Sequence, residues 1–237
     1  MTKIDTTVQR LYLLQLSTTT IPLPGGQKLE MVSGCYLIQT SAGKHVLVDS
    51  GLPAGYEQQK NVLEHLAELG LRPAKIDTVI CTHFDVDHAG YHDAFPQAEF
   101  IVQRSHYELA RGGHPRLAPA RAHWDHPALR YRLIDGDLEL LPGLTLIESS
   151  GHVTGHQSVL LRLPRTGPVL LAIDAVVMER LFTRERKAWP MDENEEQLLA
   201  STGKLLDLVQ RDQVKLTIFG HDGLQWQTLT KAPAWYE

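Results

Sequence analysis

The chain has 237 residues, a formal net charge of −5, 43% hydrophobic residues and 22% charged residues. This length suits one domain spanning 1–237, and the composition is ordinary for a globular protein with a large core. The net negative charge argues against a nucleic-acid-binding surface. No apolar run reaches the length of about eighteen residues that a membrane span needs. The first residues lack an apolar segment, so we expect no signal peptide and a cytoplasmic location.

In the first half of the chain, apolar patterns predict strands over 8–17, 31–40, 45–49, 76–81 and 99–103. Apolar positions at helical spacing predict a helix over 56–69, which Gly70 ends. Ser105 is a candidate N-cap for a short helix through Arg111. The segment 104–132 as a whole is rich in arginine, histidine and proline and has weak periodicity, so we expect mostly loop. Such a segment is either a lid over a site or a solvated basic face.

The second half repeats this order of elements. Strands are predicted over 144–149, 157–163, 168–173 and 215–219, and an amphipathic helix over 192–209. Strands followed by a helix, twice along the chain, favour two similar halves with two sheets packed inside and helices outside. The two cysteines, Cys35 and Cys81, lie in apolar runs and are expected to be buried thiols.

One short stretch concentrates side chains that bind metal ions. It follows the predicted strand 76–81 and contains His83, Asp85, Asp87 and His88. Imidazole and carboxylate groups are metal ligands, and a strand end is where ligands usually bind in open α/β sheets. In an extended turn His83 and Asp85 point the same way and could bind one ion. Asp87 and His88 are adjacent, so they diverge and could contact a second ion.

Three further predicted strands end just before a potential ligand. Strand 144–149 precedes His152, strand 168–173 precedes Asp174, and strand 215–219 precedes His221. If these strand ends meet the end of strand 76–81, the side chains form a site for two metal ions. The sequence therefore predicts a dinuclear centre at one edge of the sheets.

These residues resemble the signature of the metallo-β-lactamase superfamily, which is H-x-H-x-D-H followed by a glycine-histidine pair, an aspartate and a late histidine. Within it, the stretches 151–158, 166–175 and 218–222 are similar to the N-acyl-homoserine lactonases. The resemblance implies an α/β (α+β) fold, a four-layer αβ/βα sandwich. It also implies one ion on His83, Asp85 and His152, a second on Asp87, His88 and His221, and Asp174 as a bridge.

The implied activity is metal-dependent hydrolysis of a lactone or ester, with an N-acyl-homoserine lactone as the type of substrate and quorum quenching as the role. A hydroxide between two divalent ions would attack the carbonyl, and Asp87 would pass the proton to the leaving alkoxide. We expect zinc, with manganese or iron as alternatives. The partner is a small molecule, and a homodimer is compatible with the sequence. Four aromatic residues are expected to shape an apolar substrate pocket: Phe84, Tyr91, Trp124 and Phe182.

Two positions depart from the family pattern. Asp85 stands where the motif has its second histidine, which is similar to the H-x-E-x-D-H of flavodiiron proteins. The residues after Asp174 are Ala-Val-Val-Met, where lactonases of this group have a tyrosine. The alternatives are therefore a thioester hydrolase, a pyridoxolactonase-like enzyme or a diiron redox protein. The extra carboxylate at Asp85 offsets one more positive charge of the ions, which favours harder ions and a less acidic bound water.

Overall fold

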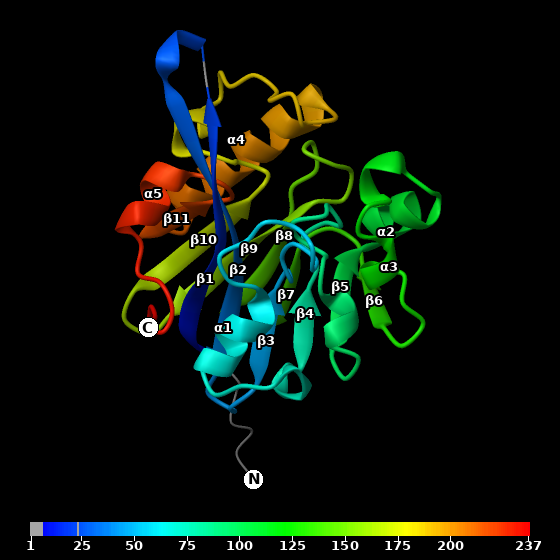
Figure 1. The fold of residues 1–237 in the computed structure, drawn as a ribbon. Coiled ribbons are helices and arrows are strands. Elements are labelled where there is room, and N and C mark those ends of the chain that lie inside the picture. The colour runs from blue at the N-terminus through cyan, green and yellow to red at the C-terminus, as the bar shows by residue number, and fades with distance from the viewer. Residues whose placement is uncertain (1–6, 23) are drawn as a thin grey trace.

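The computed structural model describes residues 7–22 and 24–237 (Figure 1). The expectation that no signal peptide is present rests on the first residues of the chain, and residues 1–6 lie outside the described part. The first sheet has six strands in the order β1-β2-β3-β4-β5-β6, antiparallel from β1 to β3 and parallel from β3 to β6. Its strands are β1 (Val8–Pro22), β2 (Lys28–Thr40), β3 (His45–Val48), β4 (Thr78–Ile80), β5 (Glu99–Gln103) and β6 (Arg130–Ile134).

The second sheet has five strands in the order β11-β10-β9-β8-β7. It is antiparallel from β7 to β10, and β11 pairs with β10 in parallel. Its strands are β7 (Leu138–Leu141), β8 (Leu144–Glu148), β9 (Gln157–Leu163), β10 (Gly167–Ile173) and β11 (Leu216–Phe219).

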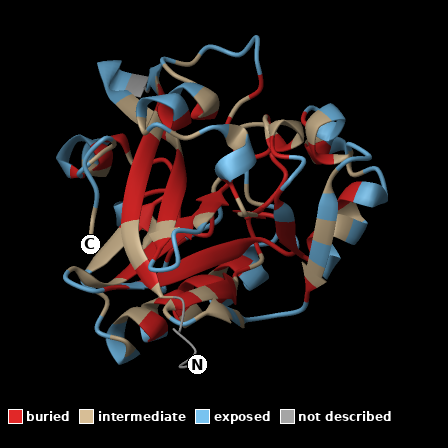
Figure 2. Cartoon of the chain, turned by 90° about the horizontal axis from the view of Figure 1, so that it is seen from below, coloured by how far each residue is buried: buried red, intermediate tan, exposed pale blue. Residues whose placement is uncertain are grey.

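Alternating side chains build a separate core on each face of each sheet. Along β1, Leu11 and Leu13 face the second sheet, whereas Tyr12 and Leu14 face the opposite way, because successive strand side chains point to opposite faces. The core between the sheets joins residues of β1–β6 to residues of β8–β11. The central strands of both sheets are largely buried and drawn red in Figure 2, whereas the edge strands β6 and β7 are mostly intermediate or exposed.

Helices cover the two outer faces. α1 (Val62–Glu68) places Val62 and Leu66 against the outer face of the first sheet, and α4 (Glu195–Arg211) places Leu205 and Leu208 against the second. The result is the four-layer αβ/βα sandwich that the sequence predicts. The remaining helices are α2 (Arg104–Arg111), α3 (Arg121–Trp124), α5 (Gly223–Thr228) and the short 3-10 turns η1 (Pro24–Gly26), η2 (Pro73–Lys75), η3 (His92–Ala94), η4 (Pro115–Leu117) and η5 (Glu179–Leu181).

Three sequence predictions of elements were wrong. The helix predicted over 56–69 begins only at Val62, because Asn61 accepts hydrogen bonds from the amides of Leu63 and Glu64 and fixes the helix start there. The short helix predicted through Arg111 is present as α2, but the segment 104–132 is not mostly loop, since it also contains η4, α3 and the beginning of β6. The edge strands β6 and β7 were missed because an edge strand keeps polar or half-exposed positions, which weakens its apolar pattern.

Within residues 7–22 and 24–237, none of the helices combines the length and the apolar content that a bilayer crossing requires.

Candidate metal centre

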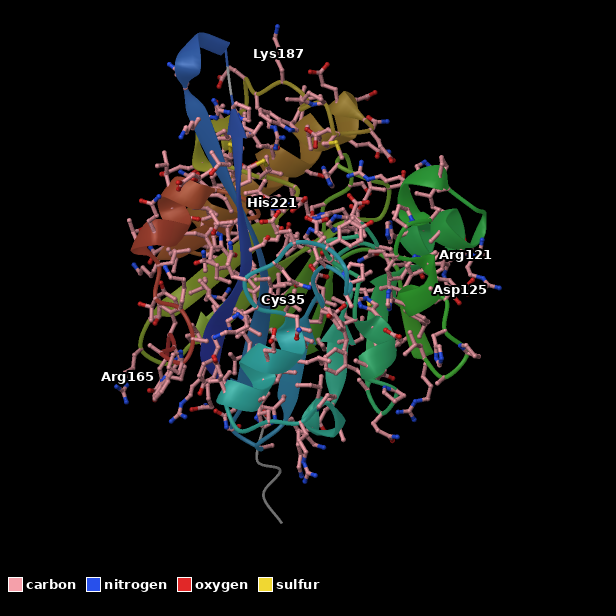
Figure 3. All side chains as sticks on the ribbon, viewed as in Figure 1. Cys35, Arg121, Asp125, Arg165, Lys187 and His221 are labelled. Atoms are coloured by element: carbon pink, nitrogen blue, oxygen red, sulfur yellow. The ribbon has the colours of Figure 1, made fainter. Side chains whose placement is uncertain are left out.

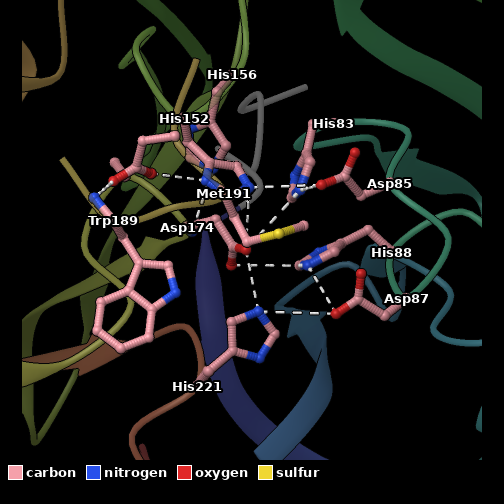
Figure 4. A network of polar contacts seen from close by, with 12 residues as sticks. His83, Asp85, Asp87, His88, His152, His156, Asp174, Trp189, Met191 and His221 are labelled. Carbon is pink, nitrogen blue, oxygen red and sulfur yellow. Dashed lines mark hydrogen bonds and ion pairs between the residues drawn. The ribbon is translucent and has the colours of Figure 1, made fainter. Parts of the chain in front are cut away.

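The four strand ends singled out in the sequence meet at one edge of the sandwich. β4 leads into the loop from His83 to His88, β8 into His152, β10 into Asp174 and β11 into His221. Figure 4 shows these side chains gathered around Asp174. Residues separated by up to 138 positions, from His83 to His221, therefore share one cluster.

One half of the cluster consists of His83, Asp85 and His152, whose candidate ligand atoms lie within 4.8 Å of one another. The Oδ2 atom of Asp85 lies 3.5 Å from His83 Nε2 and 3.4 Å from His152 Nε2. All three side chains are buried, so water does not compete strongly for their ligand atoms.

The other half consists of Asp87, His88 and His221, again within 4.8 Å. The Oδ2 atom of Asp87 lies 3.7 Å from the Nε2 atoms of both histidines. Asp174 stands between the halves. Its Oδ2 atom lies 3.4 Å from His152 Nε2 and 3.0 Å from His221 Nε2, and its Oδ1 atom lies 3.6 Å from His88 Nε2. Asp174 thus contacts both halves, as a bridging ligand must.

The Nδ1 atom of each cluster histidine is already hydrogen-bonded, so each ring turns its Nε2 toward the centre. His88 Nδ1–H donates to Asp49 at 2.8 Å, His152 Nδ1–H to Asp192 at 2.9 Å, and His221 Nδ1–H to the Val32 carbonyl at 2.8 Å. The Thr82 hydroxyl donates to Asp49 and accepts from His83 Nδ1–H at 3.0 Å. Such partners fix the tautomer and the ring orientation of metal-binding histidines.

The donor atoms of the cluster fit two divalent cations. Within the described residues, the buried atoms His83 Nε2, His88 Nε2 and Asp174 Oδ1 have no hydrogen-bond partner, and such unpaired buried polar atoms are costly. The carboxylates also make the cluster strongly negative. Burial favours neutral His221, yet Asp174 and Asp87 outweigh burial and raise its pKa to about 9. Cations at these positions would relieve both problems, because they accept the lone pairs and balance the carboxylates.

The backbone around Asp174 is strained in a way that fixes the carboxylate. Ile173, the residue before it, has φ of 53°, which is a genuine outlier for a β-branched residue. A Cβ at Gly220 would lie 2.5 Å from Asp174 Oδ1 and 2.8 Å from the Ile173 carbonyl oxygen. Only glycine therefore leaves room for the carboxylate, and strained backbone of this kind gathers at functional sites.

A cavity of about 220 Å³ opens beside the cluster. Its apolar wall comes from the β1–β2 hairpin and from the segment between β10 and α4. The non-cluster residues lining it are Thr19, Ile21, Met31, Ser33, Arg116, Val177, Trp189 and Met191. Both Trp189 and Met191 line the cavity, and Figure 4 shows their side chains next to the cluster.

None of the four aromatic residues predicted to shape the pocket lines this cavity. Phe84 and Trp124 are fully buried and stack at 5.0 Å between ring centroids, which places them in the core under the first sheet. Tyr91 packs against the same core, and Phe182 packs against Phe219 on the outer face of the second sheet. The apolar wall comes from other elements because sequence position does not show which face of a loop turns inward.

Three residues of the site were missed by sequence reasoning. Asp192 lies in the segment predicted as the start of a helix, but its side chain accepts from His152 instead. Arg116 and His106 lie in the arginine- and histidine-rich segment 104–132. Arginines of this segment differ in role: Arg121 pairs at the surface with Asp125 at 3.1 Å (Figure 3), whereas Arg116 contacts Asp85 and His152. The unusual composition of the segment was the available signal.

His106 ties two ligand-bearing loops together. Its Nδ1–H donates to the Thr154 carbonyl at 2.7 Å, and its Nε2 accepts from the Phe84 amide at 2.8 Å. The ring is therefore held neutral. Burial, together with the nearby His83 ring, lowers the pKa of His106 to about 3.

This arrangement predicts a pH-dependent loss of stability. Below pH 6.5 the unfolded chain binds a proton at His106 that the folded chain refuses until the pH falls to about 3. In metal-free protein, His106 should thus cost about 1.4 kcal/mol of unfolding free energy per pH unit across that window. Replacing it by His106→Gln should cost about 1–3 kcal/mol at neutral pH, because the terminal carboxamide cannot make the hydrogen bonds to both Thr154 and Phe84 in the geometry of the ring.

The measurement is urea unfolding of both metal-free proteins at a series of pH values. The stability advantage of the wild type should shrink as the pH falls below 6.5 and reverse in sign after about one to two pH units. A difference that stays constant would contradict the role of His106. The exposed His126 provides the control, since His126→Gln should leave the difference from wild type near zero at every pH.

Comparison with known proteins agrees with this geometry. The family description "Metallo-beta-lactamase superfamily" matches residues 31–221. The chain therefore belongs to the metallo-β-lactamase superfamily, as a metal-dependent hydrolase. An N-acyl homoserine lactonase of a Bacillus species is 31% identical, and the alignment covers 91% of this chain and 94% of the relative.

Solved structures of similar proteins share the whole fold. The crystal structure of a quorum-quenching N-acyl homoserine lactone lactonase superposes with a TM-score of 0.87 at 29% identity, covering 98% of this chain and 100% of the other. An N-acyl homoserine lactone hydrolase, solved with its product N-hexanoyl-L-homoserine at the catalytic metal centre, superposes with a TM-score of 0.85 at 27% identity. That match covers 97% of this chain and 100% of the other.

Proposed function

We propose that the chain hydrolyses a lactone of the N-acyl-homoserine type at a centre of two divalent ions. The observation that carries this proposal is the position of Asp174 between two trios of donor atoms, with unpaired Nε2 atoms turned toward it. The first trio, His83, Asp85 and His152, would hold one ion, and Asp87, His88 and His221 would hold the other. Zinc is the proposed metal, and manganese and iron are the alternatives.

The chain's own residues define how a substrate would be handled. When bound, the two ions would supply a water that ionises near neutral pH and a Lewis acid for the substrate carbonyl. The apolar wall, with Val177, Trp189 and Met191, would hold the acyl chain and keep bulk water away. The Asp87 carboxylate is 26% exposed and lines the cavity, so it can pass a proton to the leaving alkoxide.

The cavity also bears on substrate choice. Its volume of about 220 Å³ is below the range of roughly 300–1,000 Å³ that is usual for pockets of drug-sized ligands, which favours a compact substrate. No tyrosine is among the lining residues of the described chain, whereas the sequence resemblance implies one near Asp174. This difference favours keeping a thioester hydrolase and a pyridoxolactonase-like enzyme as the rival functions.

The test is a substrate panel assayed with the zinc, manganese and iron forms of the protein. The panel includes N-acyl-homoserine lactones of several acyl-chain lengths. Each of them should be hydrolysed faster than the matched thioesters and phosphodiesters. A higher kcat/KM for thioesters would replace the proposal by the rival function. An optical iron band together with oxygen consumption would favour a diiron redox protein. The cytoplasmic location and the homodimer stay predictions, and sedimentation of the purified protein tests the latter.

A further inference from the structure

The Arg116 guanidinium donates hydrogen bonds to residues in and beside one half of the metal centre. Its Nε–H donates to Asp85 at 2.7 Å, and its Nη2 donates to Asp85 Oδ2 at 2.5 Å and to His152 Nε2 at 2.6 Å. Its Nη1 donates to the carbonyls of His152 at 3.1 Å and Met191 at 2.5 Å. An arginine has five N–H donors, and all five are engaged. Arg116 therefore has no donor left for a substrate carboxylate or carbonyl, although it lines the cavity.

The position of Arg116 is built into the fold. It lies in η4 between Pro115 and Leu117, and Leu117 is fully buried in the core under the first sheet. The indole N–H of Trp124 donates to the Leu117 carbonyl at 3.0 Å and fixes this turn. The Arg116 side chain itself is only 14% exposed. The fold therefore fixes the position of this cation beside the cluster, unlike that of an arginine on the surface.

Arg116 changes the charge count made from the sequence. From the sequence, Asp85 adds one negative charge to the metal centre. In the structure, the positive charge of Arg116 lies directly beside it. Because the guanidinium stays protonated in proteins, the Asp85–Arg116 pair carries no net charge, as a neutral histidine at position 85 would. The predicted preference for harder ions therefore keeps only one reason, which is the oxygen ligand that Asp85 offers.

The guanidinium also donates a hydrogen bond to His152 Nε2, the nitrogen that would have to bind a metal ion. His152 Nδ1–H donates to Asp192, so the only lone pair left on the ring is at Nε2, and Arg116 Nη2 donates to it. In the other half, no guanidinium of the described residues contacts a ligand atom: His88 Nε2 has no hydrogen-bond partner, and His221 Nε2 lies 3.0 Å from the Asp174 carboxylate. The two halves of the cluster therefore differ in how ready they are to accept a cation.

We propose that Arg116 competes with the metal ion for the half formed by His83, Asp85 and His152. The half formed by Asp87, His88 and His221 fills first and tightly, and the second ion binds weakly and reversibly because it displaces Arg116 from His152 Nε2. This inference rests on the proposed dinuclear centre, and it adds an order of metal loading that depends on one residue of the chain.

The test is calorimetric titration of metal-free protein with Zn²⁺, combined with metal analysis after dialysis. Wild type should show two binding events whose affinities differ by at least about tenfold, or about 1.4 kcal/mol. Arg116→Gln removes the charge and should tighten the weaker event by at least about tenfold, while the tighter event stays unchanged. Arg121→Gln is the matched control, because Arg121 pairs at the surface with Asp125 alone among the described residues, and it should leave both events unchanged.

The outcomes separate this inference from the proposed function. Two ions bound with equal affinity by wild type would overturn the role of Arg116 and leave the dinuclear centre intact. The same holds if folded Arg116→Gln, checked by thermal unfolding, shows wild-type affinities. If wild type binds no metal at all, the proposed dinuclear hydrolase itself is refuted. The wild-type titration decides the question even if the variant does not fold.

Discussion

Asp174→Ala should reduce lactone hydrolysis by on the order of a thousandfold or more, beyond the roughly 10- to 100-fold effects typical of groups that only orient a ligand. Asp174 is 4% exposed and, among the carboxylates that the structure describes, is the one whose oxygens approach histidines of both halves of the cluster. Its loss removes the group that would hold two like-charged ions close together. Metal bound per chain, measured by elemental analysis of both proteins equilibrated with the same excess of Zn²⁺, should fall below the wild-type value.

The matched control for this variant is Asp207→Ala, because Asp207 is an exposed aspartate of α4 that pairs only with Arg184 among the described residues. It should retain wild-type activity and metal content. Asp174→Asn keeps the shape of the side chain and tests whether charge or shape matters. Full activity with unchanged metal content in Asp174→Ala would refute the bridging role. Thermal unfolding of the metal-free variants checks that each one folds.

The second large effect concerns stability. Asp192→Ala should lower the free energy of unfolding by about 3–5 kcal/mol, because it leaves a buried cation without its counter-charge. The side chains of Asp192 and Arg186 are both fully buried, and Arg186 Nη2 donates to Asp192 at 3.3 Å. The same carboxylate accepts from the Trp189 amide at 2.6 Å and from His152 Nδ1–H at 2.9 Å. Its removal therefore loosens the cavity wall and a ligand histidine together.

Urea unfolding of metal-free protein measures the stability change, and metal titration measures the affinity, which should fall by about 10- to 100-fold. Asp192→Asn keeps an acceptor for His152 and should recover part of the affinity but little of the stability. Asp207→Ala again serves as the control, since an exposed ion pair contributes only about 0–1 kcal/mol. A stability loss of less than about 1 kcal/mol in Asp192→Ala would show that Arg186 finds another partner.

Metal-binding side chains and their places along the chain could be read from the sequence. An apolar run identifies a buried strand, and a polar residue just after such a run lies at the strand end. This rule selected His83, His152, Asp174 and His221, and the structure brings them into one cluster. The layers were also predictable, because strands with apolar residues on both faces, such as β1, require a cover on each side.

The groups that surround those side chains were decided by the tertiary structure. Arg116 and Asp192 were read as parts of a basic segment and of a helix start, yet both hold His152 in place. The predicted aromatic pocket residues lie in cores instead, because a pattern of types does not show which face of a loop turns inward.

The sequence by itself determined the chemistry of this protein: the histidines and carboxylates, their order, and the strands that carry them. Only the tertiary structure decided the electrostatics, since the charge beside Asp85 depends on a turn 31 residues further along the chain. The physical reason is the distance along the chain over which the relevant interactions act. Strand patterns arise from neighbouring residues, whereas the field at a buried group is the sum over every charge that folding brings near it.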